Sequence, residues 1–325
     1  MSADRLGSSL GSSPSEGRPL YPRLSKAVLL TGPTGAGKSA LAIALARALG
    51  GEIVNADSLA FYRGLDIGSA KPTLSERAAA PHHLLDVVDP DEDFTAADFA
   101  RLARPLIAEI SARGRLPLVV GGTGLYLRTL VRGLFDGPPR DPGFRSRLHQ
   151  MLESGRSLHH LLSELDPLAA ARIKPTERHR LERALEVFHL TGESIVTHQA
   201  RHALADKHFD ALTVIVDLEK RELDERLRIR TQAMFEGGLV EEARGLLEKG
   251  YSPSLKPFQA VGYREAVDAA LGKIGLGEAM ASTLRRTRQL AKRQRTWFRG
   301  QMPEGLWMIP DLAAVGRVVE DFWKS

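Results

Sequence analysis

The segment 32–39 reads GPTGAGKS and matches the phosphate-loop pattern G-x-x-x-x-G-K-[ST] in full. An apolar run, KAVLLT at 26–31, predicts a buried strand before it, and the Ala/Leu-rich segment 39–49 predicts a helix after it. In such a loop the backbone N–H groups surround an oxyanion, the lysine adds a charge and the hydroxyl can ligate Mg²⁺. A di- or triphosphate is therefore expected to bind Gly32, Pro33, Thr34, Gly35, Ala36, Gly37, Lys38 and Ser39.

Strand-like runs alternate with helical patterns along much of the chain. Further strands are predicted at 52–56, 83–88, 116–120, 211–217 and 305–310. Thr95 and Asp98 form a capping box that begins a helix ending near residue 113. This alternation predicts an α/β fold with a parallel sheet flanked by helices, like that of the P-loop NTPases.

Three compositional shifts divide the chain. Residues 1–25 are rich in Ser, Gly and Pro and are expected to form a disordered tail. The GPPRDP stretch at 137–142 breaks the α/β pattern, and helical spacing follows without a strand-like run. We therefore predict a core formed by 26–137 and 207–325, with an all-helical insertion at 138–206.

Composition excludes several kinds of chemistry. The absence of Cys rules out disulfides, thiolate metal sites and cysteine nucleophiles. Forty-five Lys and Arg against 40 Asp and Glu leave a net charge of +5, which is compatible with a polyanionic partner without proving one. No apolar run approaches the roughly 18 residues of a membrane span, so a soluble cytoplasmic protein is expected.

Asp57 follows the second predicted strand. The carboxyl ends of parallel strands line the ligand crevice of an open α/β sheet. A carboxylate in that position could hold magnesium or act as a general base, or it could simply cap a turn. The residue type and position of Asp57 do not decide between a magnesium ligand, a general base and a turn cap.

Several motifs together resemble one family. The phosphate loop is followed by DSLAFYRGLDIGSAKP at 57–72, PHHLLD at 81–86, GGTGLY at 121–126, RLERALEV at 180–187, VGY at 261–263 and TRQLAKRQRTW at 287–297. In this order they are similar to the tRNA dimethylallyltransferases, and the resemblance covers about residues 26–300. The chain departs from the family pattern at Ala60, where Gln is frequent, and at Ser69, where Thr is frequent.

The resemblance implies a reaction. Family members transfer a dimethylallyl group from dimethylallyl diphosphate to N6 of the adenine immediately 3′ of the tRNA anticodon, and diphosphate leaves. Asp57 is then expected to be the general base, and Thr123 is expected to contact the diphosphate or the reacting amine. Arg226 is expected near the diphosphate, with a solvated helix face as the alternative. Mg²⁺, bound through Ser39, is the expected cofactor.

The same resemblance implies a surface for the anticodon stem-loop. The segment 285–299 carries seven basic residues and no acid, and the arginines near 180 form a second basic cluster. The residues expected to contact tRNA are Asp57, Ser58, Leu59, Ala60, Thr123, Arg145, Arg180, Arg183, Gly262, Tyr263, Arg264, Arg288, Gln289, Lys292, Arg293 and Gln294. A purely structural role remains an equal alternative for Tyr263.

Three other functions are compatible with parts of the sequence. A P-loop kinase or NTPase would use the phosphate loop and Asp57 equally well, but it does not account for GGTGLY or TRQLAKRQ. Prenylation of free adenine nucleotides would not need a helical insertion or basic surfaces. An RNA-binding module with an inactive phosphate loop conflicts with the intact Lys38, Ser39 and Asp57. Nothing in the sequence demands a dimer, so a monomer is expected.

Overall fold

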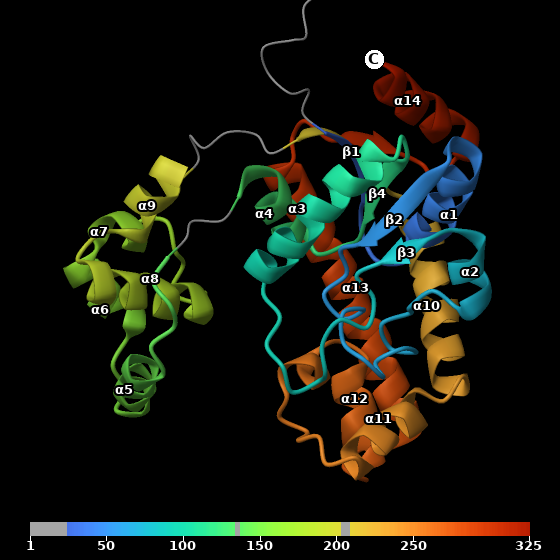
Figure 1. Ribbon diagram of the computed structural model, residues 1–325. Coiled ribbons are helices and arrows are strands. Elements are labelled where there is room, and N and C mark those ends of the chain that lie inside the picture. Colours follow the sequence, from blue (N-terminus) through green and yellow to red (C-terminus); the bar gives the residue numbers. More distant parts are fainter. Residues whose placement is uncertain (1–24, 134–136, 203–208) are drawn as a thin grey trace, which may run out of the picture.

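A parallel β-sheet forms the centre of the protein (Figure 1). The computed structural model describes residues 25–133, 137–202 and 209–325. Within them the sheet has the strand order β3-β2-β4-β1-β5-β6, and every neighbouring pair is parallel. The strands are β1 (Lys26–Thr31), β2 (Gly51–Asn55), β3 (His82–His83), β4 (Leu116–Val120), β5 (Asp210–Val216) and β6 (Leu306–Met308). This architecture confirms the predicted fold class.

Both faces of the sheet are buried under helices. Val28 and Leu30 of β1 pack with α1 (Lys38–Leu49) and α14 (Leu312–Lys324), whereas Leu29 packs with α3 (Ala96–Ala112) and α4 (Gly124–Arg132). Because each strand is covered on two sides, KAVLLT is continuously apolar rather than alternating. The predicted capping box of α3 is present, with Thr95 and Asp98 each accepting the other's backbone N–H.

The C-terminal part of the core is helical. Its longest helix, α13, contacts α4, α10 and α12 and therefore joins the sheet layer to the lower part of the core (Figure 1). Residues 249–255 separate α11 from the helices that follow. The bounds are α2 (Leu74–Ala79), α10 (Lys220–Glu236), α11 (Leu239–Glu248), η1 (Lys256–Gln259), α12 (Tyr263–Ala270) and α13 (Leu276–Gln301).

The segment between α4 and β5 is helical wherever the structure describes it. Its helices are α5 (Pro142–Glu153), α6 (Leu158–Leu165), α7 (Pro167–Ala170), α8 (Arg178–Thr191) and α9 (Ile195–His202). They enclose a hydrophobic cluster of their own, which includes Leu148, Leu162 and Leu185. The predicted boundary between 206 and 207, and the predicted tail up to residue 24, lie outside the described residues.

One predicted strand is wrong. Instead of a strand over 83–88, β3 ends at His83, and Leu84 and Asp86 have φ angles of 59° and 56°. The chain turns there because its amides bond another segment: Asp86 N–H donates to the carbonyl of Ala60, and Val87 N–H donates to that of Phe61. The apolar residues of 84–88 therefore pack against the segment that follows Asp57 rather than extending the sheet.

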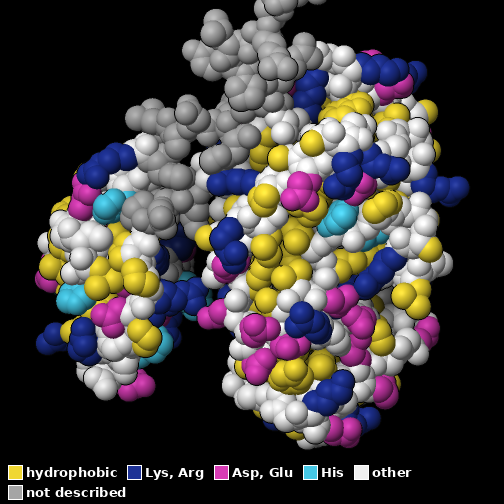
Figure 2. Space-filling model, viewed as in Figure 1, with side chains coloured by type: hydrophobic (Ala, Val, Ile, Leu, Met, Phe, Trp, Pro, Cys, Tyr) yellow, Lys and Arg dark blue, Asp and Glu magenta, His cyan; other side chains and the backbone are white. Residues whose placement is uncertain are grey.

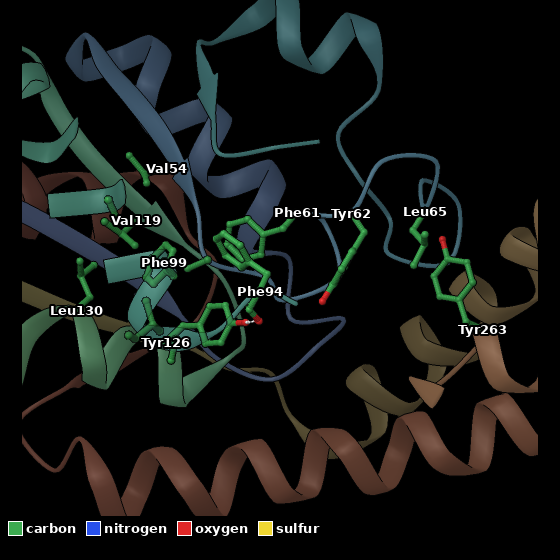
Figure 3. Close-up of a cluster of buried hydrophobic side chains, with 14 of the residues drawn as sticks. Val54, Phe61, Tyr62, Leu65, Phe94, Phe99, Val119, Tyr126, Leu130 and Tyr263 are labelled. Atoms are coloured by element: carbon green, nitrogen blue, oxygen red, sulfur yellow. Dashed lines mark hydrogen bonds between the residues drawn. The ribbon is translucent and has the colours of Figure 1, made fainter. Parts of the chain in front are cut away.

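Buried aromatic rings hold the segment after Asp57 in place. Phe61 packs against Phe94 and Tyr126, with ring centroids 4.4 and 5.7 Å away, and Phe99 completes the cluster (Figure 3). The Tyr126 hydroxyl donates to the carbonyl of Phe94 at 3.1 Å, drawn as a dashed line in Figure 3. The paired aromatic rings make this a rigid anchor next to the crevice.

Candidate active site

The phosphate loop joins β1 to α1 in a conformation that requires glycine. Gly32 and Gly37 have φ angles of 137° and 90°, and a Cβ on Gly32 would lie 2.0 Å from the Val216 carbonyl oxygen. The Lys38 ammonium donates to the carbonyls of Gly32 and Pro33 at 3.1 and 2.8 Å. Burial, together with the nearby Arg230 charge, lowers the pKa of Lys38 to about 8. The loop thus holds a cation at the N-terminus of a helix, where an anion is favoured.

A pocket opens beside this loop, and six of the predicted site residues line it. It lies at the carboxyl ends of β1, β2 and β4, as expected for an open α/β sheet. The lining residues that the sequence predicted are Thr34, Lys38, Ser39, Asp57, Ala60 and Gln294. Those it did not predict include Ala42, Ile53, Asn55, Lys71, Leu85, Val120 and Arg230.

Asp57 lies in this pocket with one carboxylate oxygen engaged. Its Oδ1 accepts the N–H of Leu59 at 2.9 Å, and its own N–H donates to Asn55 Oδ1 at 3.0 Å. No cation of the described chain forms a salt bridge with it, so Oδ2 is available to a ligand. Asp57 is also the only carboxylate among the described residues that line the pocket.

Thr123 orients the residue after Asp57. Its Oγ1 accepts the N–H of Ser58 at 3.1 Å and donates to Ser58 Oγ at 3.3 Å. Thr123 is the N-cap residue of α4 and does not line the pocket itself. The structure therefore brings it to the Asp57 segment, while its predicted contact with substrate stays a prediction.

The arginine that lines the pocket is Arg230, one helical turn after the predicted Arg226. Arg230 donates to Thr34 Oγ1 at 3.3 Å, and burial lowers its pKa while Asp57 opposes that shift. Arg226 pairs with Glu222 at 2.9 Å and lies outside the pocket lining, close to Gly37. The i, i+4 spacing puts both arginines on one face of α10, so spacing alone could not decide which one reaches the pocket.

Gln294 of α13 forms hydrogen bonds to both the phosphate loop and the GGTGLY segment. Its Oε1 accepts the N–H of Thr34 at 2.9 Å, and its Nε2 donates to the carbonyl of Gly122 at 2.9 Å. A Cβ on Gly122 would lie 2.6 Å from that Nε2, and one on Gly124 would lie 2.3 Å from the Trp297 ring. Gly122 and Gly124 therefore permit α13 to approach the site closely.

The basic segment of α13 is less charged than its sequence indicates. Arg295 forms a bidentate pair with Asp217, Arg286 pairs with Glu265 at 2.6 Å, and Arg288 lies 3.7 Å from Asp224. Acids that are distant in sequence therefore neutralise part of the positive charge of this basic segment. Lys292 and Arg293 are exposed and have no ion-pair partner among the described residues, and Gln289 is exposed beside them.

Of three predicted tRNA contacts, Tyr263 has the purely structural role in this structure, whereas the contacts of Arg145 and Arg183, which are 25% and 30% exposed, stay predictions. Tyr263 is fully buried, and its hydroxyl donates to Glu242 Oε1 at 2.6 Å. Arg145 and Arg183 both bond Glu186, a carboxylate with no exposed surface. Gly262 is also buried, as the N-cap of α12, whereas Arg180 and Arg264 are exposed and remain candidates.

The buried Glu186 makes the helical insertion sensitive to acid. Burial raises its pKa, but bonds from Arg145, Arg183 and the Asp141 N–H outweigh burial and bring the pKa from 4.5 to about 2. Because the folded-state pKa is the lower one, the stabilisation is complete above about pH 5 and is lost as the pH falls from 4.5 towards 2. Glu186→Ala should cost about 3–5 kcal/mol, since two cations lose their partner. Circular dichroism during acid titration measures both effects, and an unchanged acid transition in the variant would contradict this assignment.

The fold and the pocket define a P-loop α/β protein whose phosphate loop lies beside a single carboxylate among the described lining residues. Sequence comparison identifies the family. The profile of the IPP transferases matches residues 60–301, and that of the isopentenyl transferases matches residues 25–88. The tRNA dimethylallyltransferase of Geobacter sulfurreducens is 48% identical over 85% of this chain and 89% of its own length. The chain belongs to the IPP transferase family.

Solved structures agree with this assignment. The tRNA isopentenylpyrophosphate transferase of Bacillus halodurans is 38% identical and aligns with a TM-score of 0.68 over 92% of this chain and 95% of its own. A eukaryotic dimethylallyltransferase acting on tRNA is 31% identical, with a TM-score of 0.71 over 84% of this chain and 70% of its own. Among residues 25–133, 137–202 and 209–325, no helix combines the length and apolar character that a membrane crossing requires.

Proposed function

We propose that this enzyme transfers a dimethylallyl group from dimethylallyl diphosphate to N6 of the adenine immediately 3′ of the anticodon in tRNA. The observation that carries the proposal is one pocket that holds both the phosphate loop and the carboxylate of Asp57. As the C–O bond of the donor breaks and the C–N bond forms, the adenine N6 proton passes to Asp57 and diphosphate leaves. Lys38 and the loop amides stabilise the charge that develops on the leaving group.

The apolar part of the pocket supports a prenyl donor over a nucleoside triphosphate. The pocket that contains Lys38 and Ser39 is also lined by four apolar side chains, which are Ala42 of α1, Ile53 of β2, Val120 of β4 and Leu85. Such a surface suits a five-carbon hydrocarbon next to a diphosphate.

Mg²⁺ fits the donor groups of the pocket. Ser39 presents its hydroxyl at the start of α1 and lines the pocket. Mg²⁺ prefers such oxygen ligands and completes its shell with waters and substrate phosphates. When bound, the ion would neutralise charge on the departing diphosphate.

RNA recognition is assigned to the exposed cations of α13, joined by Arg180 and Arg264. The target adenine must leave the anticodon stack, which single-stranded loops permit at modest cost. In the view of Figure 2, acidic side chains gather over the lower part of the core, where α11 lies in Figure 1. RNA phosphates are repelled there, so that face is not expected to bind the tRNA.

One incubation tests the proposal. Label from dimethylallyl diphosphate should appear in the anticodon loop of unmodified tRNA when Mg²⁺ is present. Label on free adenine nucleotides instead of tRNA would favour the small acceptor. Consumption of ATP without transfer of label would favour a kinase.

The apolar pocket yields a test of donor binding. Ala42→Leu places three more carbons in the pocket and should lower kcat/KM for dimethylallyl diphosphate by about tenfold or more, because one added methylene group is worth roughly 1–3 kcal/mol there. Affinity for inorganic diphosphate should not change. Ala46→Leu is the matched control, since Ala46 is buried on the same helix but does not line the pocket. Equal losses in the two variants would show that strain in α1, rather than the pocket, is responsible.

The protein is further inferred to act as a monomer in the compartment that holds its tRNA substrate. Sedimentation at working concentration tests the oligomeric state.

A further inference from the structure

The chain contains a single asparagine, Asn55, and it touches the proposed general base. Asn55 is the last residue of β2, is 8% exposed and lines the pocket. Its Oδ1 accepts the Asp57 N–H at 3.0 Å, and its Nδ2 donates to the Asp57 carbonyl at 3.2 Å. One side-chain amide therefore bonds both backbone groups of Asp57.

A third bond ties this amide to the turn after β3. Nδ2 of Asn55 also donates to the carbonyl of Leu84 at 3.0 Å. Leu84 and Asp86 have φ angles near +60°, and within the described residues the only other non-glycine residue with positive φ is Ala70. Such conformations are strained for non-glycine residues and persist only where the surrounding contacts impose them.

The buried side chain of Lys71 holds Leu84 and Asp86 in these positive-φ conformations. Its side chain is 1% exposed, and its ammonium donates to Asp86 Oδ1 at 2.6 Å, Asp66 Oδ1 at 2.7 Å and the Tyr62 carbonyl at 2.6 Å. Arg77 bonds the second oxygen of Asp86 at 3.1 Å. The buried cation thus joins the Leu84–Asp86 turn to the segment that begins at Asp57.

We propose that Asn55 is a positioning residue that holds Asp57 against the reacting amine, and that the turn clamped by Lys71 supplies the fixed acceptor that Asn55 requires. This inference rests on the proposed role of Asp57. The N–H of Leu59 holds Oδ1 of Asp57. The direction of Oδ2 therefore depends on the backbone of Asp57, and Asn55 fixes that backbone by bonding both its N–H and its carbonyl. A displacement of about 1 Å at a reacting group can cost about 10²-fold in rate.

The test compares Asn55→Leu and Asn55→Ala with Tyr126→Phe. Both Asn55 variants remove all three bonds, and conclusions are drawn from either one that retains the wild-type circular dichroism spectrum. Tyr126→Phe is the matched control because it removes one buried side-chain bond to a carbonyl without touching Asp57. The single-turnover rate, the KM for tRNA and the affinity for inorganic diphosphate are measured for each.

We expect the single-turnover rate of the Asn55 variants to fall by about 30- to 100-fold, with the KM for tRNA and diphosphate affinity within threefold of wild type. Lys71→Met should give the same pattern to a smaller degree. A rate loss no greater than that of Tyr126→Phe, or a parallel collapse of both affinities, would overturn the positioning role. If Asp57→Asn itself keeps full activity, the general-base assignment fails; if only Asp57→Asn is slow, the inference about Asn55 fails alone.

Discussion

Asp57→Asn should lower kcat by about 10²- to 10⁴-fold, the range supplied by a positioned general base. Adenine N6 is a poor nucleophile, and the described pocket lining offers no second carboxylate that could take its proton. The amide can keep Oδ1 as the acceptor for Leu59 N–H, so the local turn is preserved. Affinity for tRNA should stay within a few-fold, and single-turnover kinetics with saturating donor and tRNA measure the chemical step directly.

A matched variant separates chemistry from charge. Asp217→Asn also removes one acid near Lys38, but Asp217 bonds Arg295 and does not line the pocket. A large fall in tRNA affinity for Asp57→Asn would count against the general base and would favour a role in holding the RNA. An equal fall in kcat for both variants would point to the electrostatics of Lys38 instead.

The second large effect is expected from Arg288, Lys292 and Arg293. Their combined replacement by Ala should weaken tRNA binding and reduce the slope of log K against log salt by about 2 to 3, because each lost phosphate contact releases about one counterion fewer. Lys292 and Arg293 carry most of this effect, since Arg288 lies near Asp224. Filter binding between 50 and 300 mM salt gives the slope.

The control removes the same charge elsewhere. Arg47 of α1, Lys249 at the end of α11 and Arg317 of α14 are exposed and lie on other elements. Their triple Ala variant should leave the slope within about 0.5 of wild type, since none is expected to contact phosphate. If both triple variants shift the slope alike, the effect is one of net charge and the RNA surface must lie elsewhere.

Local patterns predicted most of the fold. A strand that is buried on both faces is a short continuous apolar run, so the strands could be predicted from KAVLLT, LPLVV and ALTVIV alone. The capping box of Thr95 and Asp98 marks a helix start within four residues. The phosphate loop is equally local. Those features need no knowledge of distant partners.

Features that depend on distant partners were less predictable. HLLDVV is as apolar as a strand, yet its amides bond Ala60 and Phe61, and the pattern carries no sign of that pairing. The pairing of Arg145 and Arg183 with Glu186, and of Arg295 with Asp217, likewise forms only when separate elements meet. Asn55, Lys71 and Arg230 became candidates only when the fold placed them in one pocket.

The bond from Gln294 to the phosphate loop limits how such enzymes can be re-engineered. Helix α13 presents Lys292 and Arg293 to solvent. Its next residue, Gln294, supplies the amide that bonds Thr34 and Gly122. Grafting α13 from another enzyme to change the choice of tRNA would therefore also replace a support of the phosphate loop. Exchange of the outward residues alone, with position 294 kept as Gln, is the change that leaves this support intact.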